Sequence, residues 1–185
     1  MVKTNINLFA EGEVVYTDGG ALAEFAWLLV VLPFIAALVI TFVGKNLPLK
    51  GAEIALGTIG IIFSYSLALM YLHITKGVAN EFFINVGSIG QFDIEFGWVV
   101  DGLSIMMYFV VGLVALLVFI YATNYMEGEI RYTFFFTSLT LFAGSMLVLV
   151  SSPTLIQILI GWELVGVCSY LLIGHYWEVK DNSSA

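Results

Sequence analysis

Residues 153–177 read PTLIQILIGWELVGVCSYLLIGHYW, an apolar run long enough to cross a bilayer as one helix. With a rise of about 1.5 Å per residue, the carboxylate of Glu163 would lie about 14 Å from Thr154, near the centre of the hydrocarbon layer. A charge there costs about 2.5 to 3.5 kcal/mol, which the flanking Leu, Ile and Val residues can offset at about 0.3 to 0.6 kcal/mol each. The run therefore predicts a membrane span whose acidic side chain faces other helices or water.

The stripe around Glu163 suggests what this side chain does. On a helical wheel Glu163 shares one face with Gly166, Tyr170, Gly174 and Trp177. The two glycines would let a neighbouring backbone approach, and the phenol could form a hydrogen bond. Surroundings of low dielectric raise the pKa of a carboxylic acid, and a nearby cation lowers it again, so that such a group can bind and release protons near neutral pH. Glu163 is thus a candidate proton carrier, and the alternative is a buried acid that only organises helix packing.

The composition is typical of a membrane protein and excludes an ordinary soluble domain. Of 185 residues, 61% are hydrophobic and 11% are charged, whereas a soluble domain has about 25% charged residues. The net charge of −8 argues against a nucleic-acid partner. The one cysteine, Cys168, lies inside an apolar run, so we expect neither a disulfide framework nor a thiolate metal site. Glu11, Glu13 and Asp18 precede the first apolar run, which therefore does not resemble a signal peptide and is expected to be a retained span.

Hydropathy divides the chain into a polar extension (1–20), a membrane domain (21–177) and a tail (178–185). We give the extension no regular structure and expect the tail to be truncated. Glycines at Gly57 and Gly60 are expected to allow close helix packing. The predicted spans cover about residues 21–44, 52–74, 102–123, 132–150 and 154–177.

One segment between the spans has a different period. Residues 92–98, FDIEFGW, alternate apolar and polar side chains, and residues 82–86, FFINV, precede them across GSIG at 87–90. This alternation is typical of half-buried strands and predicts a β-hairpin over residues 81–99. The predicted fold is an all-α polytopic membrane protein with five transmembrane helices and a small external β-hairpin.

The distribution of cations predicts the orientation. With five spans, one side of the membrane gathers four cations and the other gathers two, namely Lys45, Lys50, Arg131 and Lys180 against Lys3 and Lys76. The positive-inside rule makes the first side cytoplasmic. We therefore expect the amino terminus and the hairpin outside.

Two further ionisable residues are candidates for the site. Asp101 precedes a predicted helix and fits a helix N-cap at the membrane interface, with gating of proton exit as the alternative. His175 lies beside Tyr176 and Trp177 at the end of the last span, which fits an interfacial aromatic belt. Because the pKa of histidine is near neutrality, His175 could also serve proton entry. No phosphate-binding loop or metal-ligand motif is present in the sequence, so redox chemistry is not expected in this chain.

Three motifs resemble one family in the same order. Residues 161–174, GWELVGVCSYLLIG, resemble the fifth-helix signature of the antiporter-like subunits of NADH-quinone oxidoreductase, respiratory complex I, and most of all its chain L type. Residues 100–104, VDGLS, and 124–132, NYMEGEIRY, resemble two further motifs of that subunit. The resemblance covers the five amino-terminal helices, but not the first twenty residues. Subunits of Mrp-type cation/proton antiporters share these motifs.

The resemblance implies a proton-translocating membrane subunit that houses no redox step. It is not catalytic alone, and quinone reduction in other subunits supplies the energy. NADH, FMN, iron–sulfur clusters and quinone would belong to those partner subunits. Glu163 matches the family glutamate that pairs with a lysine on the seventh helix, and that lysine lies outside this sequence. We therefore expect a fragment or a split subunit, completed by the remaining helices and the other membrane subunits, in a bacterial plasma membrane.

The alternatives from other classes are an Mrp-type cation/proton antiporter subunit and a structural membrane module. In the antiporter, transport would follow an imposed ion gradient without NADH. In the structural module, Glu163 would only organise assembly, so that Gln would be tolerated at this position and Leu would not.

Overall fold

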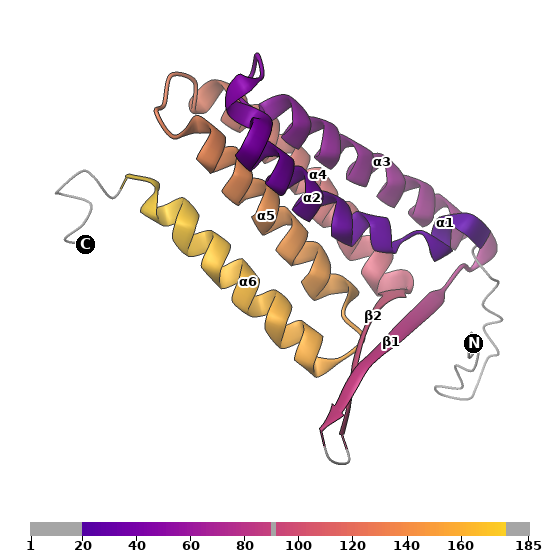
Figure 1. Cartoon of the computed structure of the whole chain (residues 1–185). Helices are drawn as coiled ribbons and strands as arrows, with labels where there is room; N and C mark the ends of the chain where they lie inside the picture. Colours follow the sequence, from indigo (N-terminus) through magenta and orange to yellow (C-terminus); the bar gives the residue numbers. More distant parts are fainter. Residues whose placement is uncertain (1–19, 90–91, 177–185) are drawn as a thin grey trace.

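The computed structural model describes residues 20–89 and 92–176 and shows a helical bundle with one hairpin (Figure 1). Five helices are long and apolar enough to cross a membrane, which confirms the predicted fold class. The predicted amino-terminal extension up to residue 19 and the predicted tail lie outside the described residues. In chain order the elements are α1 (Gly20–Glu24), α2 (Trp27–Val43), η1 (Gly44–Asn46), α3 (Ala52–Lys76), β1 (Asn80–Ile89), β2 (Phe92–Val100), α4 (Gly102–Tyr125), α5 (Tyr132–Ser151), α6 (Leu155–Ile173) and η2 (Gly174–Tyr176).

The first span differs from the expected uninterrupted helix over 21–44. The chain forms the short helix α1, turns at Phe25 and Ala26, and starts again as α2 at Trp27. Pro33 lies inside α2, and the helix continues through it. The span is extended at its far end by η1, so that its apolar stretch runs from Trp27 to Asn46.

The helices are arranged as a bundle with α6 at one side. In Figure 1, α5 lies between α2 and α6, and α3 lies beside α4. Helix α6 packs mainly against α5, with no comparable contact to α2, α3 or α4. Within this chain, α6 is therefore the peripheral span.

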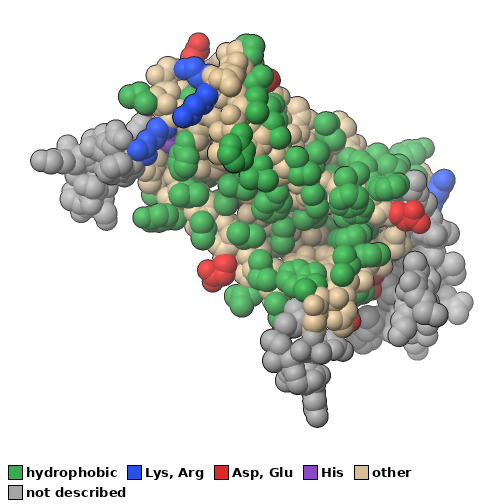
Figure 2. Space-filling view, viewed as in Figure 1, with side chains coloured by type: hydrophobic (Ala, Val, Ile, Leu, Met, Phe, Trp, Pro, Cys, Tyr) green, Lys and Arg blue, Asp and Glu red, His purple; other side chains and the backbone are tan. Residues whose placement is uncertain are grey.

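Successive helices run in opposite directions, so the bundle has two different ends. We call one the hairpin end, where α3 stops, the hairpin attaches, and α4 and α6 begin. We call the other the basic end, which carries Lys45, Lys50 and Arg131 on the α2–α3 and α4–α5 links. Figure 2 shows Lys and Arg side chains gathered at the basic end, while hydrophobic side chains cover the middle of the bundle.

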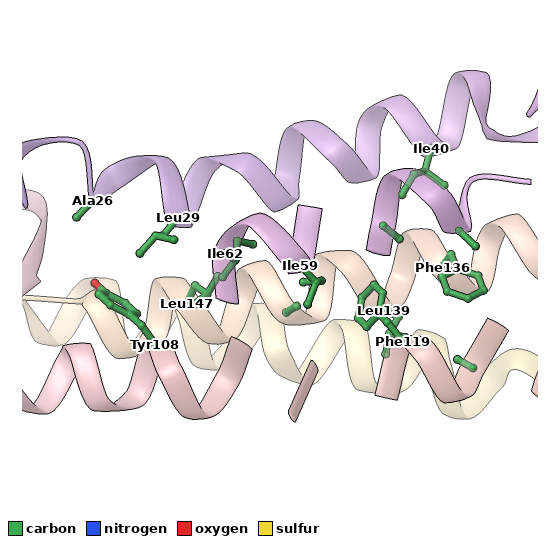
Figure 3. Packing of buried hydrophobic residues seen from close by; sticks show 14 of the residues in the cluster. Ala26, Leu29, Ile40, Ile59, Ile62, Tyr108, Phe119, Phe136, Leu139 and Leu147 are labelled. Atoms are coloured by element: carbon green, nitrogen blue, oxygen red, sulfur yellow. The ribbon is translucent and has the colours of Figure 1, made fainter. Parts of the chain in front are cut away.

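The core is apolar along the whole bundle (Figure 3). Toward the hairpin end, Leu29 of α2, Ile62 of α3 and Leu147 of α5 are almost fully buried. Toward the basic end, Phe119 and Phe136 meet edge to face, with ring centroids 6.1 Å apart. Burial of these side chains joins α2, α3, α4 and α5 into one packed unit, and α6 packs against it.

The hairpin is confirmed, although its turn lies later than expected. Residues 87–89, which were expected to turn, still belong to β1, and β1 pairs antiparallel with β2. The pairing of the two strands continues beyond Gly87, and a bulge between Asn85 and Gly87 accommodates one extra residue of β1. Phe82 and Trp98 face each other across the strands and stack, with ring centroids 4.4 Å apart.

Candidate functional site on α6

The start of α6 is fixed to the hairpin by polar contacts. Thr154 caps the helix by accepting the N–H of Gln157 at 3.4 Å, and its hydroxyl donates to the Glu95 carbonyl at 3.1 Å. The amide of Gln157 is buried and forms two hydrogen bonds with Gly97. The Gly97 N–H donates to Oε1 of Gln157 at 2.9 Å, and Nε2 of Gln157 donates to the Gly97 carbonyl at 2.8 Å. Gln157 thus binds both backbone polar groups of Gly97 in β2.

The middle of α6 approaches α5 closely at one glycine. A Cβ on Gly161 would lie 3.0 Å from the Leu149 Cα, so the two backbones are almost in contact. Further along, the Cys168 sulfur lies 3.8 Å from the Ser145 hydroxyl. The buried residues of α6 are Gln157, Gly161 and Cys168, and their spacing defines the face that meets α5.

Glu163 lies halfway along α6 and on the opposite face. It follows Gly161 by two residues, which turns it about 200° around the helix axis. Its side chain is exposed in this chain, as are Trp162 and Tyr170. In the apolar stretch of α6, 17% of the residues are buried, against 33% to 39% in the other four spans. The expected position at mid-span is therefore observed, and its covering by other helices stays a prediction.

The glycines that were expected to allow close helix packing have open space around them among the described residues. A Cβ on Gly166 or Gly174 would meet no heavy atom of the described residues within 4 Å, and the same holds for Gly57 and Gly60. The close approaches use Gly112, Gly144 and Gly161, whose added Cβ would lie 3.0 to 3.2 Å from a neighbouring helix. The face that carries Glu163 and Gly166 therefore has room for another backbone.

Asp101 acts as the N-cap of α4. Its Oδ1 accepts the Ser104 N–H at 2.7 Å, and its backbone is extended, as an N-cap requires. The residue is half-buried at the hairpin end. Gating of proton exit by Asp101 stays a prediction.

His175 lies at the basic end, in η2, where it is 6% exposed. Its ring packs edge to face on Phe135 of α5, with centroids 5.6 Å apart. Burial lowers the pKa of the imidazole below its ordinary value of 6.5, the Glu129 carboxylate opposes this by raising the pKa, and Arg131 lowers it further. The expected aromatic surroundings are present, and proton entry through His175 stays a prediction.

The structure does not bring the three predicted site residues together. Asp101 lies at the hairpin end, Glu163 at mid-span and His175 at the basic end. Among residues 20–89 and 92–176, no group of three or more His, Cys, Asp or Glu side chains could hold a metal ion. Among the described residues of α6, Glu163 is the one carboxylic acid, and it lies on the face that the described residues leave uncovered.

The structural roles of Gln157 and Lys50 were not predicted from the sequence. Gln157 interrupts the apolar run two residues into α6, and this polar residue between isoleucines was the available signal. Lys50 adopts a left-handed backbone conformation, with φ of 48°, for which its residue type gave no signal.

The fold is that of a polytopic membrane protein, with five apolar helices and one β-hairpin among the described residues. Its last span carries an acidic residue at mid-span. A family model described as the chain 5 N-terminus of NADH-ubiquinone oxidoreductase (complex I) matches residues 87–136. Over these residues the chain is similar to the chain 5 subunits of that complex, and its five apolar helices are those of a multi-pass integral membrane protein.

Individual relatives extend this likeness over most of the chain. NAD(P)H-quinone oxidoreductase chain 5 of Picosynechococcus is 39% identical over 172 residues, which cover 89% of this chain and 26% of that protein. Chain 5 of Synechocystis is 40% identical over 171 residues, covering 89% and 25%. The chloroplastic subunit 5 of Chara vulgaris is 39% identical over 170 residues, covering 88% and 25%. The chain spans about a quarter of the length of these relatives.

Proposed function

We propose that this chain is part of a proton-translocating membrane subunit of an NAD(P)H-quinone oxidoreductase, with Glu163 as its proton-transfer group. The observation that carries the proposal is the position of Glu163, which lies at mid-span on the face of α6 that this chain leaves uncovered. A carboxylate at this depth is too costly to leave facing lipid, so another helix or a water-filled path must cover it. Homology to chain 5 subunits supports a partner helix from the same complex.

The proposed mechanism is electrostatic. An ionised Glu163 stabilises the protonated form of a cationic side chain that faces it, which we expect to be a lysine of the covering helix. When Glu163 takes up a proton, this stabilisation is lost, the pKa of the lysine falls, and the lysine releases its proton. Charge is thereby passed sideways between groups buried in the membrane, which requires that both lie in surroundings of low dielectric.

The redox chemistry is proposed to lie in partner subunits. The described residues contain no group of metal-binding side chains that would fit an iron–sulfur cluster, and no step of NADH, FMN or quinone chemistry is assigned to them. We propose that the chain is a non-redox subunit and that its partners are the remaining helices of the subunit and the other membrane subunits. Because the basic end carries Lys45, Lys50 and Arg131, we place it in the cytoplasm, with the hairpin and the amino terminus outside a bacterial plasma membrane.

The test is Glu163→Gln in the complex that contains this chain, reconstituted in proteoliposomes. Gln keeps the size of the side chain but cannot ionise, so NAD(P)H-driven acidification should fall several-fold while the complex still assembles. Glu163→Asp keeps the carboxylate and should retain part of the pumping. Unchanged pumping by the Gln variant would contradict the proposal.

Two further measurements separate the alternatives. A structural role predicts that Gln is tolerated for both assembly and pumping, and that Glu163→Leu impairs assembly. An antiporter subunit predicts that an imposed Na⁺ or K⁺ gradient drives proton movement without NAD(P)H. The proposed function predicts no such gradient-driven exchange.

A further inference from the structure

The two links at the basic end form a pocket of about 300 Å³. Lys45 and Lys50 from the α2–α3 link and Arg131 from the α4–α5 link all line it. Arg131 is far from both lysines in the sequence, and the fold brings all three cations around one space. Three cationic side chains at a membrane interface are suited to a phosphate group, with which Lys and Arg form charge-assisted hydrogen bonds.

The link that carries the two lysines is held in a specific conformation. Lys50 has φ of 48° and Gly51 has φ of 99°, so two successive residues are left-handed. The Thr133 hydroxyl of α5 donates to the Lys50 carbonyl at 3.0 Å. Glu53 accepts the N–H groups of Leu49 and Gly51 at 3.3 and 3.2 Å. A left-handed conformation is unfavourable for lysine, and these contacts compensate for it, so Lys50 is positioned by the fold.

A close approach fixes the other lysine beside the same helix. A Cβ on Gly44 would lie 2.9 Å from the Thr133 Cγ2, so the start of η1 lies directly against α5. Lys45 follows immediately and is thereby placed next to the α4–α5 link. Thr133 thus contacts both ends of the α2–α3 link, and Arg131 precedes it by two residues.

Among the described residues, three acids lie near the pocket cations in the sequence. Glu53 directs its carboxylate to the backbone of its own link. Glu127 and Glu129 belong to the same link as Arg131 but are not among the residues that line the pocket. The described residues that line the pocket are three cations, two hydroxyl residues and two apolar residues, with no acid among them.

The surroundings of the pocket are apolar and point to a lipid. Ile130 in the pocket wall is 98% exposed, and Phe134 is 43% exposed. Phe42, one turn before the link, is 80% exposed. Figure 2 shows the cationic end joined directly to the hydrophobic middle of the bundle. A ligand with an anionic head and apolar tails would match both regions, whereas free phosphate would match the cations alone.

We propose that this pocket binds the phosphate-bearing headgroup of an anionic membrane lipid. Lys45, Lys50 and Arg131 hold the phosphate, and the acyl chains lie along the exposed apolar side chains of α2 and α5. The proposal does not depend on proton transfer at Glu163.

The test is photo-crosslinking in the complex that contains this chain. The probe is phosphatidylglycerol with a photoactivatable group near its headgroup, and cross-linked peptides are mapped by mass spectrometry. Cross-links should concentrate in residues 42–50 and 130–134. Their yield should fall about ten-fold or more in the triple variant Lys45→Gln, Lys50→Asn, Arg131→Gln, since each cation near an anionic lipid contributes to affinity. Asn is chosen at position 50 because it tolerates the left-handed conformation.

Controls separate lipid binding from misfolding and from free phosphate. Lys76→Gln removes an exposed cation at the hairpin end and should leave the yield unchanged. Lys45→Arg keeps the charge and should retain the cross-links. Equal labelling by a phosphatidylcholine probe, unchanged labelling of the triple variant, or complete competition by inorganic phosphate would each overturn the proposal.

Discussion

At the scale of single residues, the polar side chains of this chain have clearly different tasks. Gln157 is buried and fully engaged with Gly97, so it serves structure, whereas Glu163 is exposed and has no hydrogen bond or ion pair to another described residue. The two lie six residues apart on α6. The contacts made by Gln157 therefore set the position of the helix that carries Glu163.

Gln157→Leu should destabilise the junction between the hairpin and α6. The substitution introduces an apolar side chain of similar size and removes the hydrogen bonds of Gln157 to the N–H and carbonyl of Gly97, at a cost of about 1 to 3 kcal/mol for each buried group left unsatisfied. Hydrogen exchange of the amides at 95–99 should become faster in the variant. Leu155→Ala, at a side chain that is 82% exposed, is the matched control and should leave this exchange unchanged. Equal protection in both variants would contradict the assigned role.

His175 should make stability depend on pH. Its pKa is lowered in the folded protein, chiefly by burial, so below the ordinary value of 6.5 the unfolded chain binds more protons than the folded chain. Stability should therefore be fully present above pH 6.5 and fall as the pH drops from 6.5 toward the folded-state pKa. Thermal unfolding on either side of this pH should show the loss, and His175→Gln should reduce it. A midpoint that rises on acidification would contradict this reading.

At the scale of elements, one side of α6 is fixed by this chain and the other is not. Gly161 lets the backbones of α5 and α6 meet, while Gly166, five residues later, borders the uncovered face. These two glycines provide a direct comparison. In a membrane, close approach through small residues is a main source of helix association.

Gly161→Ala should weaken the contact between α5 and α6. The added methyl would lie 3.0 Å from the backbone N and Cα of Leu149, which cannot move aside as a flexible side chain could. We expect a loss of about 1 to 3 kcal/mol, the usual cost of overpacking. Unfolding by a denaturing detergent should show this loss of stability. Gly128→Ala is unsuitable as a control, because Gly128 has φ of 89°, which is unfavourable for alanine. Gly57→Ala, with open space around it in this chain, should be the milder change.

The sequence predicted the elements better than their partners. Hydropathy located five spans because a membrane-crossing helix must be apolar along its length, and period-two alternation located the hairpin. Neither pattern predicted the break at Phe25 and Ala26, or which glycines meet another helix, since both depend on packing between distant segments. For the same reason, the mid-span position of Glu163 could be predicted, but the pairing of Gln157 with Gly97 could not.

At the scale of the whole molecule, four of the described spans share one apolar core, and α6 packs on it through one face. The apolar cluster joins α2, α3, α4 and α5, and α6 adds one buried face to it. Its other face carries Glu163, Gly166 and Tyr170, and Tyr170 is 75% exposed. This arrangement suits a helix that lies between this bundle and a further part of the proposed complex.

Gly166→Leu should therefore impair assembly with that further part. The substitution fills the space through which another backbone is expected to approach, and it meets no described atom of this chain within 4 Å of the Cβ. The amount of intact complex on native gels should fall, with Gly166→Ala as the smaller step in the series. Normal assembly of the Leu variant would show that no helix packs closely at this face.

The most direct test of the account is the number of protons translocated per NAD(P)H oxidised by the intact complex with Glu163→Gln. The account predicts a lower ratio at an unchanged amount of assembled complex, because the substituted side chain cannot carry a proton. The same ratio as in the original complex would contradict a proton-transfer role for Glu163.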